Sequence, residues 1–175
     1  MNITQFDKFS QACSKELATT IGTILETAKD KEGCLIGFIT TDDFYGCHLT
    51  WDYSGNVNEY FNWNNGLRPN FLYQPLVDVV EECEEIDFCR PSAEKWEFAK
   101  TLLLVLEKNI KEIPDELFKK NGFKREDILF FSTMSAGDYT SEMIDTSVKK
   151  FNTTDTLEKY ELNSNLLKSK AAKLY

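Results

Sequence analysis

The chain lacks several features that would assign it to a function class at once. No apolar run approaches the roughly 18 residues that a membrane span requires. The N-terminal segment 1–7 has no basic stretch followed by an apolar one, which is the pattern that directs export. The sequence therefore argues against an integral membrane protein and predicts a cytoplasmic location.

The local signatures of common enzyme classes are also missing. The sequence contains no Gly-x-Ser-x-Gly, Gly-x-x-x-x-Gly-Lys-Ser/Thr, Gly-x-Gly-x-x-Gly or His-Glu-x-x-His, so nucleophile elbows, phosphate loops, dinucleotide turns and zincin helices have no marker. His48 is the only histidine, and on an extended strand it points away from its neighbour Cys47, which argues against a Cys-His dyad. These absences predict a protein that is not an enzyme and that binds no cofactor or metal.

Cysteine is present in an odd number and without a Cys-x-x-Cys pair. Four of the five cysteines fall within apolar patterns, which is typical of buried free thiols rather than of redox or metal sites. The five are Cys13, Cys34, Cys47, Cys83 and Cys89.

The composition is that of a folded, acidic chain. With 175 residues, of which 42% are hydrophobic, the chain is long enough for one domain (1–175) with a core that needs no disulfide or metal. The net charge is −9, from 29 acidic and 20 basic residues, so the average field repels phosphate backbones and anionic lipids. The charge predicts no nucleic-acid or membrane partner and favours a basic protein.

Helical periodicity is clearest from 94 to 113, where two apolar stripes side by side predict a central helix covered by most of the fold. Ser92 is the expected N-cap, and Pro114 the expected end. Further helices are predicted at 4–29, at about 73–87, after Pro114, from Thr140 or Ser141, and from 152 onward.

Strands are predicted at 34–41, at 44–53 and at 128–134, the last in the middle of the sheet because it is apolar on both sides. A hairpin turning at Asp42 and Asp43 would place Phe38 opposite Cys47, although a longer turn is left open because the loop has no glycine between the strands. This register puts six side chains on one face: Cys34, Ile36, Phe38, Cys47, Leu49 and Trp51. The predicted fold is α+β, with an antiparallel or mixed sheet of about three to five strands packed by helices.

The most informative polar feature is an acidic segment at the end of the predicted helix 73–87. Like charges there repel one another, and the helix dipole disfavours anions at a C-terminus, so the segment opposes local stability. A docking surface for a basic partner is one interpretation, and a solvated face or pairing with the C-terminal lysines is the other; metal binding has weak support. The acids are Asp78, Glu81, Glu82, Glu84, Glu85 and Asp87.

Two further stretches are candidates for partner contacts. Asp42 and Asp43 suit a turn, but they could also contact a partner or a metal. Tyr60, Trp63 and Arg68 belong to a segment rich in aromatic and amide residues, of a kind enriched at interfaces, for which core packing is the alternative.

The order of these segments resembles a bacterial family known only as a domain of unknown function. The resemblance rests on Thr41-Asp42-Asp43, on 125–132 and on 147–152, and it covers about residues 5 to 160. That family is similar in size and acidity to immunity proteins of toxin systems, and the resemblance implies protein binding without supplying a catalytic residue. The expected function is an immunity protein that neutralises a toxin; a carboxylate-based enzyme and an oligomerisation module are the alternatives.

Overall fold

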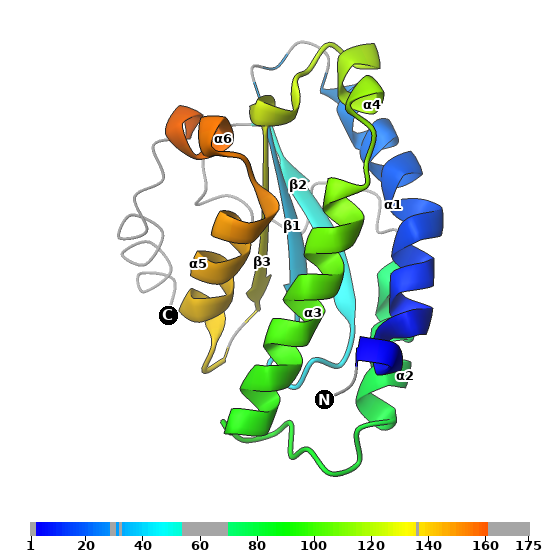
Figure 1. Ribbon diagram of the computed structural model, residues 1–175, viewed down its shortest axis with the longest axis vertical. Coiled ribbons are helices and arrows are strands. Elements are labelled where there is room, and N and C mark those ends of the chain that lie inside the picture. Colours follow the sequence, from blue (N-terminus) through cyan, green and yellow to red (C-terminus); the bar gives the residue numbers. More distant parts are fainter. Residues whose placement is uncertain (1–2, 29–30, 32, 54–69, 136, 161–175) are drawn as a thin grey trace.

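The protein folds as a three-stranded mixed sheet packed by helices (Figure 1). The computed structural model describes residues 3–28, 31, 33–53, 70–135 and 137–160. Within these ranges the elements are η1 (Ile3–Phe6), α1 (Asp7–Thr27), β1 (Cys34–Thr40), β2 (Cys47–Asp52), η2 (Asn70–Leu72), α2 (Tyr73–Glu81), α3 (Ala93–Lys111), α4 (Asp115–Lys120), η3 (Arg125–Asp127), β3 (Ile128–Met134), α5 (Thr140–Phe151) and α6 (Thr154–Lys159). The α+β class is confirmed.

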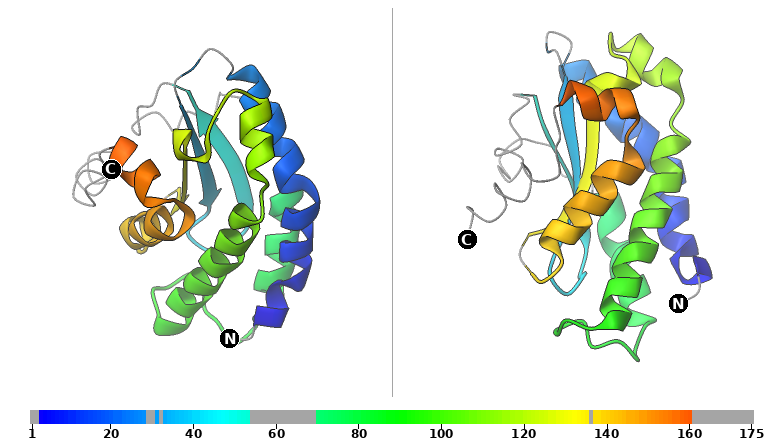
Figure 2. Two further views of the ribbon diagram at one scale, coloured as in Figure 1. Left: turned by 45° about the horizontal axis from the view of Figure 1, so that its top comes forward. Right: turned by 60° about the vertical axis from the view of Figure 1, so that its left-hand side comes forward.

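The strands lie in the order β2-β1-β3, with β1 antiparallel to β2 and parallel to β3. The strand at 128–134 is therefore correctly predicted, but its place in mid-sheet is wrong, because β1 occupies the centre of the described sheet. β3 is buried along its whole length because α5 covers its outer edge. Helices α1, α2 and α3 lie over one face of the sheet (Figure 2).

The hairpin register differs from the prediction by two residues. Phe38 lies opposite Leu49, and Thr40 lies opposite Cys47. The turn is longer than two residues, since the pairing ends at Thr40 and Cys47. Within the turn, Phe44 (φ 58°) and Gly46 (φ 105°) adopt positive φ, and the Thr40 hydroxyl donates to the Gly46 carbonyl at 2.8 Å. A slip of two residues leaves each side chain on its predicted face, and all six predicted residues lie in the main core.

Helix α3 is the predicted central helix. Ser92 caps its start by accepting a hydrogen bond from the Lys95 amide at 3.0 Å, and the helix ends before Pro114. Both apolar stripes pack into the core, with Trp96 only partly buried. The stripes also carry two buried polar residues, Lys95 and Asn109, which the periodicity did not predict.

Helix α2 ends at Glu81, six residues before the predicted end at Asp87. After Glu81 the chain forms consecutive turns. The Cys83 backbone N–H donates to the Val80 carbonyl and the Ile86 N–H donates to the Cys83 carbonyl, both at 3.0 Å. Crowded carboxylates are disfavoured at a helix C-terminus, which accounts for the early end. Cys83 and Ile86 still reach the core from these turns.

The remaining predicted elements are present, at shifted bounds. The helix expected from 4 begins as η1 and continues as α1 to Thr27, and α4 follows Pro114 and ends before Gly122, which adopts φ 82°. Helix α5 begins at Thr140, as predicted. The last helical stretch is α6 up to Lys159; its predicted continuation lies outside the described residues.

Side chains of the α5 segment close the outer edge of β3. The Asn152 side chain accepts a hydrogen bond from the Phe130 backbone N–H at 2.8 Å. It also donates one to the Phe130 backbone carbonyl at 2.6 Å. The Ser147 hydroxyl accepts from the Ser132 amide at 2.8 Å and lies 3.2 Å from the Ser132 carbonyl. These contacts take the place of a neighbouring strand, which protects the edge from pairing with another chain.

Candidate functional site

The predicted acidic segments meet at one end of the molecule. Strands β1 and β3 run toward this end, and the β1–β2 loop and the connection from α2 to α3 both lie there (at the bottom of Figure 1). The Tyr45 hydroxyl in the loop donates to Glu81 at 2.8 Å and joins the two segments. We call this region the acidic end; its residues are Asp42, Asp43, Asp78, Glu81, Glu82, Glu84, Glu85 and Asp87.

Most acids of the α2 segment already have partners. Glu82 pairs with Lys8 at 3.2 Å, and Asp87 pairs with Arg90 at 3.6 Å. Asp78 accepts from Gln74 at 2.8 Å, and Glu81 accepts from Tyr45. Glu84 and Glu85 are exposed and make no hydrogen bond or ion pair with other described residues. The two acids that remain available for a partner are therefore adjacent in the turn that follows α2.

Asp42 and Asp43 have different roles. Asp43 accepts from the Thr41 hydroxyl at 2.6 Å and from the Tyr45 amide at 3.1 Å, as a turn aspartate does. Asp42 accepts from Lys95 at 3.2 Å; the Lys95 side chain is fully buried, whereas 44% of the Asp42 side chain is exposed. Asp42 is thus bound within the fold, and Asp43 shapes the loop that carries Tyr45.

The ion pair between Lys95 and Asp42 connects segments that meet at the acidic end. Lys95 comes from the first turn of α3, and its ammonium lies 5.9 Å from the centre of the Tyr139 ring. Tyr139 precedes α5, stacks on Trp96, and donates to the Ser92 carbonyl at 2.8 Å. Asp42 also packs against Gly137, where any side chain would collide with its carboxylate. Sequence reasoning missed Lys95; the one signal was a lysine where an acid usually follows an N-cap.

The third predicted stretch, with Tyr60, Trp63 and Arg68, lies outside the described residues.

The cysteines are four buried thiols and one exposed thiol. This matches the expectation that four of the five are buried; Cys89 sits in the exposed turn before Pro91. Burial raises the pKa of Cys13 to about 12 and raises the pKa values of Cys34 and Cys47 further. These three side chains remain protonated at neutral pH and therefore are poor nucleophiles. Among the described residues, no group of three or more His, Cys, Asp or Glu side chains is arranged to hold a metal ion.

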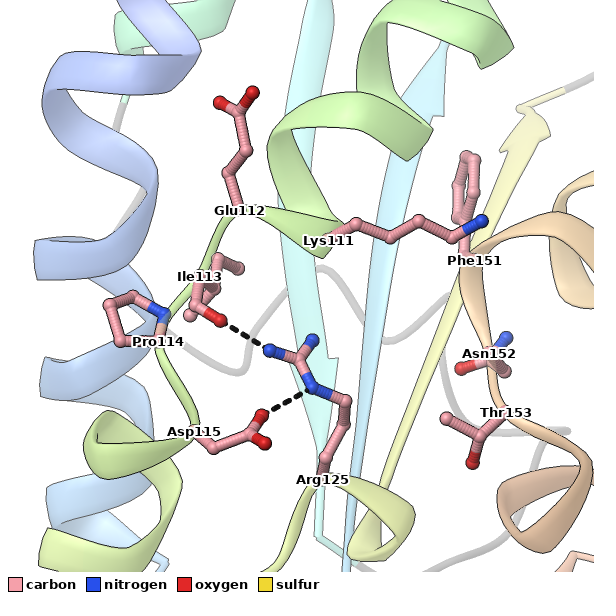
Figure 3. Close-up of a pocket in the computed structure, with 9 residues that line it drawn as sticks. All are labelled: Lys111, Glu112, Ile113, Pro114, Asp115, Arg125, Phe151, Asn152 and Thr153. Carbon is pink, nitrogen blue, oxygen red and sulfur yellow. Dashed lines mark hydrogen bonds and ion pairs between the residues drawn. The ribbon is translucent and has the colours of Figure 1, made fainter.

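A cavity of about 550 Å³ lies at the opposite end of the molecule (Figure 3). Its wall comes from the end of α3 with the turn into α4, from Arg125 at the start of η3, and from the segment that joins α5 to α6. The lining residues are Lys111, Glu112, Ile113, Pro114, Asp115, Arg125, Phe151, Asn152 and Thr153.

Arg125 is the best-anchored charge in this cavity. Its guanidinium donates to Asp115 at 2.7 Å, to the Ile110 carbonyl at 3.3 Å, and to the Ile113 carbonyl. It also lies 4.7 Å from the centre of the Phe118 ring. The hydrogen bond and charge of Arg125 lower the pKa of Asp115. Arg125 thereby satisfies the Ile113 carbonyl just beyond α3 and gives a second donor to the Ile110 carbonyl, which also accepts from the Ile113 amide at 3.2 Å.

The acid nearest to Lys111 is shared between two lysines. Glu107 accepts from Lys111 at 2.6 Å and from Lys150 at 3.4 Å. Burial opposes ionisation, but the two lysines more than offset it and lower the pKa of Glu107. Glu107 therefore pairs with two cations, of which Lys111 lines the cavity.

Comparison of the chain with protein-family models, with curated proteins and with solved structures gave no match. The family resemblance inferred from the sequence gains no support from these comparisons and stays a prediction. No helix among the described residues combines the length and the apolar character needed to cross a membrane.

Proposed function

We propose that this protein binds a basic protein partner at its acidic end, as an immunity protein that neutralises a toxin does. The observation that carries the proposal is the convergence of two separate acidic segments on one end, with Glu84 and Glu85 exposed beside them. Opposite charges on a partner would be steered toward such a surface and oriented by it.

Tyr45 supports the same surface as an anchor. It is one of only two large hydrophobic side chains that are exposed among the described residues, at 43%. Its hydroxyl is held by Glu81, so its ring is presented in a fixed orientation. Aromatic residues surrounded by polar groups are the usual source of binding energy in an interface.

The proposal is tested by affinity capture with three versions of the protein as bait, in lysate of the organism that encodes it. The wild type is compared with E84K/E85K and with E26K/E116K, which changes the net charge equally at exposed sites on α1 and α4. We expect one protein to be captured by the wild type and by the control, and to be lost from E84K/E85K and at high salt.

The immunity role requires a second result. The captured protein should be basic, should arrest growth when expressed alone, and should be harmless when co-expressed with the wild type. Equal capture by E84K/E85K and the wild type would refute docking at the acidic end. A captured protein that is harmless by itself would refute the immunity role.

A further inference from the structure

The structure assigns a second binding site, independent of the acidic end: we propose that the cavity between Lys111, Arg125 and Thr153 binds a small molecule through a phosphate or carboxylate group. Its volume of about 550 Å³ lies within the range of small-molecule sites in proteins. The cavity is shaped by three separate segments of the chain (Figure 3).

The two cations of the lining, Lys111 and Arg125, keep hydrogen-bond donors that the fold does not use. Lys111 has three N–H groups, and its ammonium contacts one carboxylate oxygen, of Glu107. Arg125 has five N–H groups, of which three are directed at Asp115 and at the carbonyls of Ile110 and Ile113. A ligand group that only accepts hydrogen bonds fits this inventory, and phosphate and carboxylate groups are of that kind.

The neutral polar residues of the wall are committed to the fold. Both N–H groups of the Asn152 side chain are used, by the carbonyls of Phe130 and Val148. The Thr153 hydroxyl accepts from the Thr156 amide at 3.2 Å and contacts the Thr156 hydroxyl at 3.0 Å. These contacts fix the wall but leave little capacity for a ligand, so recognition falls to the two cations.

The two acids of the lining do not block such a ligand. The Glu112 side chain is directed away from both Arg125 and Lys111 (Figure 3). Asp115 lies on one side of the guanidinium, and the space toward Lys111, Asn152 and Thr153 lies on the other (Figure 3). Phe151 and Ile113 form the floor of the cavity, but both are buried in the core and add little apolar surface.

The experiment uses the full chain and two probes, inorganic phosphate and acetate, added in separate titrations at constant ionic strength and followed by amide NMR shifts. We expect saturable shifts at 111–115, 125 and 151–153 with one of the probes, which would identify the preferred group. K111Q should weaken that binding at least about tenfold. K108Q removes the same charge from an exposed position one turn earlier, outside the cavity, and should leave the affinity unchanged.

Absence of saturable shifts at the cavity with both probes would overturn the proposal. Equal weakening by K108Q and K111Q would also overturn it, because the binding would then depend only on the general charge of the helix end. Neither substitution touches the acidic end, so capture of a basic partner by K111Q separates failure of this site from failure of the proposed function.

Discussion

The two ends of the molecule both carry carboxylates, but they use them differently. At the cavity end, Glu107 and Asp127 are mostly buried and paired, with 19% and 20% of their side chains exposed. At the acidic end, Glu82 and Asp87 are paired but largely exposed, at 51% and 60%, and Glu84 and Glu85 have no partner among the described residues. Exposed pairs contribute little to stability. The contrast indicates that Glu107 and Asp127 hold the fold together at the cavity end, whereas Glu84 and Glu85 are free of structural pairing among the described residues at the acidic end.

The largest effect should come from an exception to this contrast, the ion pair at the acidic end between the buried Lys95 and the partly exposed Asp42. D42A leaves the Lys95 ammonium buried without its carboxylate, and we expect a loss of about 2 to 4 kcal/mol, reduced from the fully buried case because Asp42 is partly exposed. K95M leaves an aspartate that water can solvate, and should lose only about 1 kcal/mol. Urea denaturation of both variants measures the asymmetry. Equal losses would mean that the Lys95 head group is not confined as described.

The next largest effect is expected at Arg125. R125A removes the donor to the Ile113 carbonyl and one of the two donors to the Ile110 carbonyl, and should lower the free energy of unfolding by about 1 to 3 kcal/mol. D115N removes only the exposed partner of the same arginine and should have a much smaller effect. If D115N lowers the stability as much as R125A does in thermal and urea unfolding, then Arg125 stabilises the fold through its ion pair with Asp115 and not through its hydrogen bonds to the carbonyls.

The contrast also predicts how stability depends on pH. Burial acts against ionisation of Asp127, yet Lys159 and the Lys124 amide lower its pKa, as lysines lower that of Glu107. A lowered folded-state pKa gives a contribution that is complete above the unfolded value, near 4, and is lost as the pH falls through the folded value. We expect the urea concentration at the unfolding midpoint to decrease as the pH is lowered below about 5. E107Q should flatten part of this dependence; an unchanged slope would show that other groups cause it.

The smallest effect on stability should come from the acids that are proposed to bind. E84K/E85K changes two exposed residues in a turn and should alter the free energy of unfolding by no more than about 0.5 kcal/mol in either direction. The same variant should lose the basic partner. A large destabilisation would place Glu84 and Glu85 among the structural charges and would remove the distinction between the two ends.

Elements fixed by local patterns could be predicted from the sequence. The apolar stripes of α3, its cap at Ser92 and its end at Pro114 all depend on spacing within a few residues. The faces of β1 and β2 also follow from alternation. The prediction of which side chains lie on the core face is therefore correct although the predicted register differs by two residues. That error arose because the conformation of the loop, with positive φ at Phe44, depends on its packing rather than on its composition.

Properties that depend on distant partners could not be predicted. Strand β3 is apolar on both sides, like an interior strand, but it owes its burial to α5 rather than to a second neighbouring strand. In the sequence, Asp42 suited both a turn and a contact surface. Its role is set by the ion pair with Lys95 of α3, a residue distant in the sequence. Arg125 and the cavity it lines depend on the meeting of three segments, so no local motif marks them.

The parallel pairing of β1 with β3 also has a consequence for folding. Ser132 bonds to Phe38 across 94 residues of chain, whereas β2 follows β1 after a short loop. Closing the longer loop costs more entropy, and distant pairings slow folding. We therefore expect the hairpin and α3 to form early and β3 to join late. During synthesis on the ribosome, β1 has no partner on its β3 side until β3, which ends at Met134, has been made.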